Sequence, residues 1–291
     1  MEPWFLFAVA SAFLSGFHAY IYKIVAARNI DVIVVSVYAS FASALVLLTI
    51  TALFFGFHGI SLFIVGLALL EGLIYFTNNI FRNIALKAID TVIYFPIYKI
   101  FGPLLGICFG VVFFSEKFTP IEWTGLVISL FVPLMLIGRQ EHLRQTNLVK
   151  GLYLVLITAL LAAINATISK VGSTATSNAI VFILLADTFI ITSGFLALYA
   201  KEKRRLFTRM NRSTNSFIIQ LSVALGVIQA GAFGFFVFAF ATNGPLAIVY
   251  TIHSLYIVIP IVLSVMFYNE HLNLRKIIAV VLSIAAIGLL K

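Results

Sequence analysis

The sequence is a succession of apolar stretches, each about 20 residues long, separated by short polar breaks. A helix that crosses the hydrocarbon core of a bilayer needs roughly 20 such residues. Strict alternation of apolar and polar residues is rare, which favours helices over the strands of a barrel. The sequence therefore predicts an all-α integral membrane protein with ten transmembrane helices, at 4–24, 32–55, 60–82, 91–114, 119–138, 149–170, 178–200, 215–240, 245–268 and 273–290.

Composition excludes several other classes of protein. Charged residues make up 10% of the chain, against about 25% in soluble domains. The one cysteine, Cys108, lies within an apolar stretch, so neither a disulfide framework nor a metal site is expected, and no cofactor is expected. The net charge of +9 comes largely from loops such as 201–212, which indicates contact with anionic membrane lipid and not with nucleic acid.

The two halves of the sequence resemble each other. Residues 13–25, "FLSGFHAYIYKIV", align with 160–172, "LLAAINATISKVG", and place Lys23 on Lys170. Farther along, "VVFFSEKFT" aligns with "VMFYNEHLN" and places Glu116 on Glu270. Each half holds five helices, and an odd number turns the second copy upside down in the membrane. We expect two inverted five-helix repeats, 1–145 and 146–291, that form one membrane unit.

The ends of both halves, "FFSEKFTPIEWTGLVISLFVPLMLIG" and "FYNEHLNLRKIIAVVLSIAAIGLL", resemble the EamA-like branch of the drug/metabolite transporter superfamily. The proline-containing stretches "FGPLLGICFGVVFFSE" and "NGPLAIVYTIHSLYIVIPIVLSVMFYNE" are similar to the fourth and ninth helices of that family. The resemblance implies a multi-pass transporter of the cell membrane that is not an enzyme. It also implies that both termini lie in the cytoplasm, whereas most basic loop residues predict the opposite orientation.

Lys99 lies nine residues into the stretch 91–114, where a cation costs about 2.5–3.5 kcal/mol. The repeat relates it to His253, because 99 plus 154 is 253. Two basic groups at equivalent depths would bind an anionic group of a substrate, and the resemblance to the sugar-phosphate branch of the superfamily implies the same role. The alternative is an ion pair between Lys99 and Glu71 or Asp187, either exchanged during transport or static.

Polar residues recur at helical spacing in several of the stretches, and they are expected to face inward, away from lipid. For the serines and threonines, plain hydrogen bonding between helices is the alternative. The aromatic residues of the same stretches, Tyr20, Tyr75, Tyr94, Tyr98, Tyr250 and Tyr256, would suit a substrate with an apolar part. The candidate substrate-binding residues are Lys99, His253, Tyr98, Tyr94, Asn165, Gln229, His18, Tyr75 and Asn78.

Two carboxylates and three prolines complete the candidate machinery. Glu71 and Asp187 lie near the centres of their stretches, where acids are typical of proton relays, so either one could couple transport to protons or form an ion pair. Pro96, Pro103 and Pro260 remove backbone donors and allow bends, which makes their helices candidate gates.

These features predict a secondary active transporter that carries a small metabolite by alternating access. The expected substrate is amino-acid-like or a small organic anion with an apolar part. The alternatives are an exporter of hydrophobic or cationic compounds, of multidrug type, and a lipid flippase. An intramembrane enzyme is disfavoured because no HExxH or paired-aspartate motif is present in any stretch. The protein is expected to be a monomer or a homodimer in contact with membrane lipid.

Overall fold

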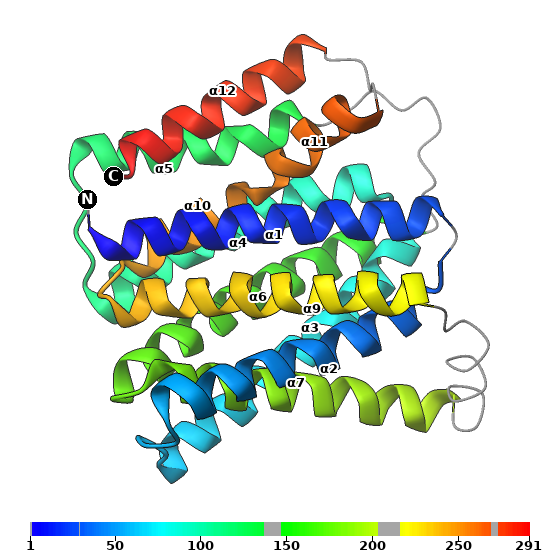
Figure 1. Ribbon diagram of the computed structural model, residues 1–291. Coiled ribbons are helices and arrows are strands. Elements are labelled where there is room, and N and C mark those ends of the chain that lie inside the picture. The colour runs from blue at the N-terminus through cyan, green and yellow to red at the C-terminus, as the bar shows by residue number, and fades with distance from the viewer. Residues whose placement is uncertain (1, 29, 137–146, 203–215, 269–272) are drawn as a thin grey trace.

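The computed structural model describes residues 2–28, 30–136, 147–202, 216–268 and 273–291, and every regular element within these ranges is a helix (Figure 1). The elements are α1 (Pro3–Ala27), α2 (Val32–Ile50), η1 (Thr51–Phe55), α3 (Leu62–Ala88), α4 (Thr91–Phe114), α5 (Pro120–Met135), α6 (Leu148–Ala175), α7 (Ala179–Glu202), α9 (Ser216–Ala241), α10 (Leu246–Ser254), η2 (Leu255–Ile257), α11 (Val258–Tyr268) and α12 (Leu274–Leu289).

Within the described residues, eight helical segments are long and apolar enough to cross a membrane. The helices α5 and α12 are shorter, with 16 residues each. The stretch 91–114 coincides with α4, but α3 continues to Ala88, six residues beyond the expected end at 82. Arginine and lysine are good helix formers, so the helix outlasts the apolar pattern. Arg82 and Lys87 consequently lie inside α3 and not in the following loop.

Short polar residues fix where several helices begin. At α5, Thr119 Oγ1 accepts from the backbone N–H of Glu122 (3.3 Å), and Glu122 Oε2 accepts from that of Thr119 (2.6 Å). This capping box satisfies two donors that the first helical turn cannot use. Asn147 and Asn273 cap α6 and α12 by accepting from the N–H three residues on. Such caps let consecutive helices reverse direction within a few residues.

The two proline-containing helices behave differently. Helix α4 is helical throughout, with Pro96 and Pro103 inside it. The segment 246–268 breaks at the 3₁₀ turn η2, which separates α10 from α11. Pro260 has no N–H, so the carbonyl of Tyr256 four residues earlier loses its helical donor at this point. The gating bends expected at Pro96, Pro103 and Pro260 stay predictions.

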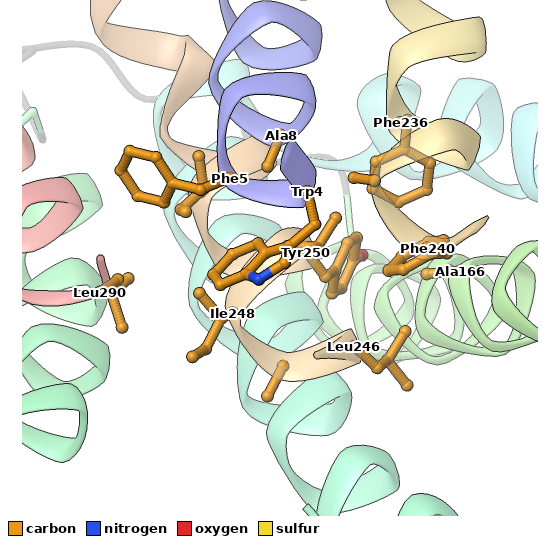
Figure 2. Close-up of a cluster of buried hydrophobic side chains, with 14 of the residues drawn as sticks. Trp4, Phe5, Ala8, Ala166, Phe236, Phe240, Leu246, Ile248, Tyr250 and Leu290 are labelled. Carbon is orange, nitrogen blue, oxygen red and sulfur yellow. The ribbon is translucent and has the colours of Figure 1, made fainter. Parts of the chain in front are cut away.

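Helices from the two halves of the sequence pack on one another. Helix α1 packs against α9 and α10, while α6 packs against α3 and α4. The helices α5 and α12 lie side by side, and both chain ends lie at the same end of the bundle (Figure 1). A buried apolar cluster holds the N-terminal end of α1 against α9 and α10, with Trp4, Phe5, Phe236, Phe240 and Tyr250 among its members (Figure 2). Large apolar side chains such as Phe54 and Val149 remain exposed, as is typical of a lipid-facing surface.

Candidate functional site

Glu71 of α3 is fully buried against α6. Its Oε1 atom accepts hydrogen bonds from the Ser169 hydroxyl and, at 3.4 Å, from Nδ2 of Asn165. The second oxygen, Oε2, has no hydrogen-bond partner. An ionised carboxylate only accepts, so the amide NH₂ of Asn165 must face Glu71. The amide oxygen of Asn165 is then directed elsewhere, and it also lacks a partner.

Lys99 of α4 is buried among aromatic rings. Its Nζ atom lies 3.8 Å from the ring centroid of Tyr256 and 5.8 Å from that of Tyr98. No carboxylate of the described residues forms an ion pair with Lys99, and the carboxylates of Glu71 and Asp187 accept hydrogen bonds from serines instead. Aromatic faces attract a cation but supply no net negative charge. Lys99 is therefore a buried cation without a counter-ion from the described part of the chain.

His253 of α10 reaches the same tyrosine from the other side. Its ring centroid lies 5.7 Å from that of Tyr256 and 4.6 Å from that of Phe236. Nδ1 lies 3.0 Å from Oγ of Ser11, whose hydroxyl donates to the carbonyl of Ala232 (2.7 Å). A serine hydroxyl has one proton, so Nδ1 is the donor in that contact and Nε2 is left as an acceptor in the neutral ring.

Tyr256 thus joins Lys99 and His253, which the repeat pairs with each other. The sequence predicts Tyr256 as one of the aromatic residues suited to an apolar part of the substrate, but not as a ligand. The sequence does contain a feature that indicates this role for Tyr256. It follows His253 by three residues, and this spacing places both side chains on the same face of a helix.

Tyr94 and Tyr98 stack on each other, with ring centroids 5.7 Å apart. The hydroxyl of Tyr94 donates to Oγ1 of Thr158 at 3.0 Å, and the Tyr94 side chain is fully buried. Tyr94 therefore ties α4 to α6. Tyr98 is only partly buried and hydrogen-bonds to Asn78 of α3, whose Oδ1 atom has no partner. Tyr98 and Asn78 extend the polar region from Lys99 toward α3.

Asp187 belongs to a separate network. Its Oδ2 atom accepts from Oγ of Ser43 at 2.9 Å, which connects α7 to α2. Gln229 of α9 hydrogen-bonds to both Asp187 and His18 of α1. Nε2 of His18 has no partner. Together with Ser43, these residues form a network that joins α1, α2, α7 and α9. Asp187 and Glu71 therefore lie in different networks.

Tyr75 and Arg82 recur at helical spacing with Glu71 and Asn78 on α3, and their side chains are more exposed than those of Glu71 and Asn78. Tyr75 is 42% exposed and makes no hydrogen bond to the described residues. Arg82 is exposed, forms no ion pair with a described residue, and interacts electrostatically with Lys99 and Tyr256. A second cation thus lies near Lys99, although the sequence analysis did not include it among the candidate ligands.

Some buried polar atoms have no hydrogen-bond partner. Within the described residues they belong to His18, Glu71, Asn78, Asn165 and Thr251, and the first four were singled out from the sequence. An unpaired buried polar group costs about 1–3 kcal/mol, and native proteins keep few of them. The arrangement is suited to non-covalent binding of a small polar molecule. Within the described residues, no group of three or more His, Cys, Asp or Glu side chains could hold a metal ion.

Comparisons with known proteins bear on the family and the fold of the chain. Residues 149–291 match the sequence model of the EamA-like transporter family. One solved chain, described only as the crystal structure of a protein, matches with a TM-score of 0.70 and 16% sequence identity, over 96% of this chain and 96% of its own. At that identity, the likeness shows the fold alone. No curated protein matches the chain.

Proposed function

Since the chain belongs, through residues 149–291, to the EamA-like transporter family, we propose that it is a secondary active transporter of a small metabolite. The substrate is amino-acid-like or a small organic anion with an apolar part. It binds near the middle of the membrane between the two halves of the chain and crosses by alternating access.

The observation that carries this proposal is Lys99 itself, a buried basic side chain that forms no ion pair with a carboxylate of the described residues. A buried cation without a counter-ion is costly, and an anionic group of a substrate would remove that cost. Arg82 adds positive charge near Lys99, and a protonated His253 would add a donor at Nε2. The aromatic faces of Tyr98 and Tyr256 are suited to the apolar part of the substrate.

The packing of the helices supports the proposed inverted repeat of 1–145 and 146–291. Helix α1 packs on α9 as α6 packs on α3, and α1 packs on α10 as α6 packs on α4. Helix α2 packs on α9 as α7 packs on α3. Each of these contacts between a helix of the first half and one of the second therefore has an equivalent contact when the two sets of five helices are exchanged. We therefore count α10, η2 and α11 as one helix of ten, and we assign the gating bends to Pro96, Pro103 and Pro260.

Coupling to protons is part of the same proposal. Asp187 and His18 are both ionisable and are linked through Gln229, which suits a path for a proton between helices. Glu71 is the other candidate. The excess of basic residues in the odd-numbered loops favours termini outside the cell, and the family resemblance favours termini inside.

An exporter of cationic compounds fits the region less well. The aromatic rings that would hold a cationic ligand, Tyr98 and Tyr256, already flank the ammonium of Lys99. A ligand cation in that place would be repelled by it. A lipid flippase would not require the buried charge of Lys99.

The test is the thermal stability of the purified protein in detergent against a panel of organic acids, amino acids, sugar phosphates and organic cations. A ligand that binds only the folded state raises stability once its concentration exceeds its dissociation constant. We expect anionic compounds to stabilise the wild type and to lose this effect in Lys99→Leu. Lys150→Leu, which removes an exposed lysine at the start of α6, is the matched control. Equal stabilisation of wild type and Lys99→Leu by anions would refute the proposed site.

A further inference from the structure

The cluster formed by Glu71, Asn165 and Ser169 has two hydrogen-bond acceptors left over. Oε2 of Glu71 and Oδ1 of Asn165 are both buried and unpartnered, and they come from the two facing helices α3 and α6. We propose that this cluster binds an amine group of the substrate, so that the transported molecule carries an ammonium group at one end and an anionic group at the other. This inference rests on the proposed function, because it places the anionic end at Lys99.

The hydrogen-bonding capacity of the cluster defines what it can accept. The proton of Ser169 and one of the two protons of the Asn165 amide are already directed at Oε1 of Glu71. A ligand that satisfies the two remaining oxygen atoms must therefore donate at least two hydrogen bonds. A primary ammonium has three donors, and its charge also neutralises the carboxylate in a region without water. A hydroxyl group has a single donor and would leave the charge uncompensated.

The competing occupant is a proton on Glu71. With the Asn165 amide turned so that Oδ1 faces Glu71, a protonated carboxyl could donate from Oε2 to Oδ1, which would satisfy both oxygen atoms without any ligand. This arrangement would make Glu71 a coupling residue. It differs from the proposal in a measurable way, since it gives the cluster no preference for substrates that carry an amine.

The two ends of the site are far apart along α3. Glu71 faces Asn165 and Ser169, whereas Asn78, seven residues later, contacts Tyr98 beside Lys99. Seven residues of helix correspond to about 10 Å. On α6, Thr158, seven residues before Asn165, binds Tyr94, which precedes Lys99 by five residues on α4. The spacing along α3 favours a substrate whose two charged groups are several carbon atoms apart over an α-amino acid, in which both groups are attached to one carbon atom.

The experiment uses isothermal titration to measure how tightly the purified protein, in detergent, binds a series of terminal amino acids of increasing chain length. The probes are 3-aminopropanoate, 6-aminohexanoate and 8-aminooctanoate, with hexanoate and hexylamine as compounds that lack one charged group. We expect wild type to bind 6-aminohexanoate at least about tenfold more tightly than hexanoate, as one charge-assisted contact provides. Because the cluster lies far from Lys99, 3-aminopropanoate should show no such preference over hexanoate.

The variant Glu71→Gln keeps an acceptor for Ser169 but removes the charge. It should bind 6-aminohexanoate and hexanoate about equally tightly. Its affinity for hexanoate should stay at the wild-type value, and that result also shows that the variant is folded. Glu122→Gln is the matched control, because glutamine also serves in the capping box of α5. This control should keep the wild-type preference.

Two results would overturn the inference. One is a wild-type protein that binds hexanoate as tightly as every amino acid of the series. The other is a Glu71→Gln variant that still binds 6-aminohexanoate more tightly than hexanoate. That result would mean that Glu71 carries a proton and does not bind the amine. Failure of the proposed function gives a different result: no carboxylate in the series then binds in a manner that depends on Lys99.

Discussion

Tyr256 is the residue that contacts both Lys99 and His253. Its ring faces the ammonium of Lys99 at 3.8 Å and packs beside the imidazole of His253. In an environment without water, a cation gains about 2 kcal/mol from such a ring. The ring therefore offsets part of the cost of burying the Lys99 ammonium when no substrate is bound.

The ring and the hydroxyl of Tyr256 can be separated by substitution. Tyr256→Leu removes the aromatic face and is expected to weaken anion binding about tenfold, since Lys99 is then held less firmly in place. Tyr256→Phe retains the face and is expected to lose less than threefold. The measurement is the dissociation constant of a stabilising anion for both variants. Equal losses in the two variants would show that the hydroxyl, and not the ring, positions Lys99.

At the scale of elements, Glu116 connects the first half of the chain to the second. Its Oε1 atom accepts from Nζ of Lys170 at 2.6 Å and from the backbone N–H of Leu246 at 2.5 Å. Its Oε2 atom accepts from the N–H of Ala247 at 3.1 Å. Glu116 thus caps the start of α10, where an anion is also favoured by the helix dipole. The position of α10, and of His253 on it, depends on this contact.

Removal of the Glu116 charge should be costly. The side chains of Lys170 and Glu116 are only 13% and 8% exposed, so Glu116→Gln leaves a mostly buried lysine unpaired. The expected loss in the free energy of unfolding is about 3 kcal/mol. The double variant Glu116→Gln/Lys170→Met should recover part of this loss, because it removes the stranded charge. Chemical unfolding in detergent measures both values, and a double variant no more stable than the single one would contradict the account.

Helices α4 and α10 approach each other closely because α4 has glycine at the contact. A Cβ atom on Gly106 would lie 2.6 Å from the ring of Tyr250, and one on Gly102 would lie 3.0 Å from its hydroxyl. Gly106→Ala is therefore expected to destabilise the protein by about 1–3 kcal/mol through overpacking. In α3, a Cβ atom on Gly66 would meet nothing within 4 Å, so Gly66→Ala should be neutral or stabilising. The pair is compared by thermal unfolding, and equal shifts would argue against close packing at α4.

At the scale of the whole molecule, the hydropathy of the sequence predicted the helices well because burial in lipid selects for apolar length. It placed α4 correctly but ended α3 too early, since the charged residues near Arg82 are good helix formers. The polar faces of the helices were predicted from helical spacing, and the structure brings Glu71 to Asn165 and Gln229 to His18. Partners such as Ser43 for Asp187 were not predicted. They depend on the rotation of each helix against its neighbour, and spacing within one helix does not specify that rotation.

The central claim is that this protein moves an anionic molecule bound at Lys99. The most direct measurement is the uptake of a labelled anion, one that stabilises the purified protein, into liposomes that contain wild type or Lys99→Leu. We predict saturable uptake by the wild type and a loss of at least about tenfold in the variant, because the substrate loses its counter-charge. Uptake by wild type no faster than into protein-free liposomes, or equal uptake by the variant, would contradict the account.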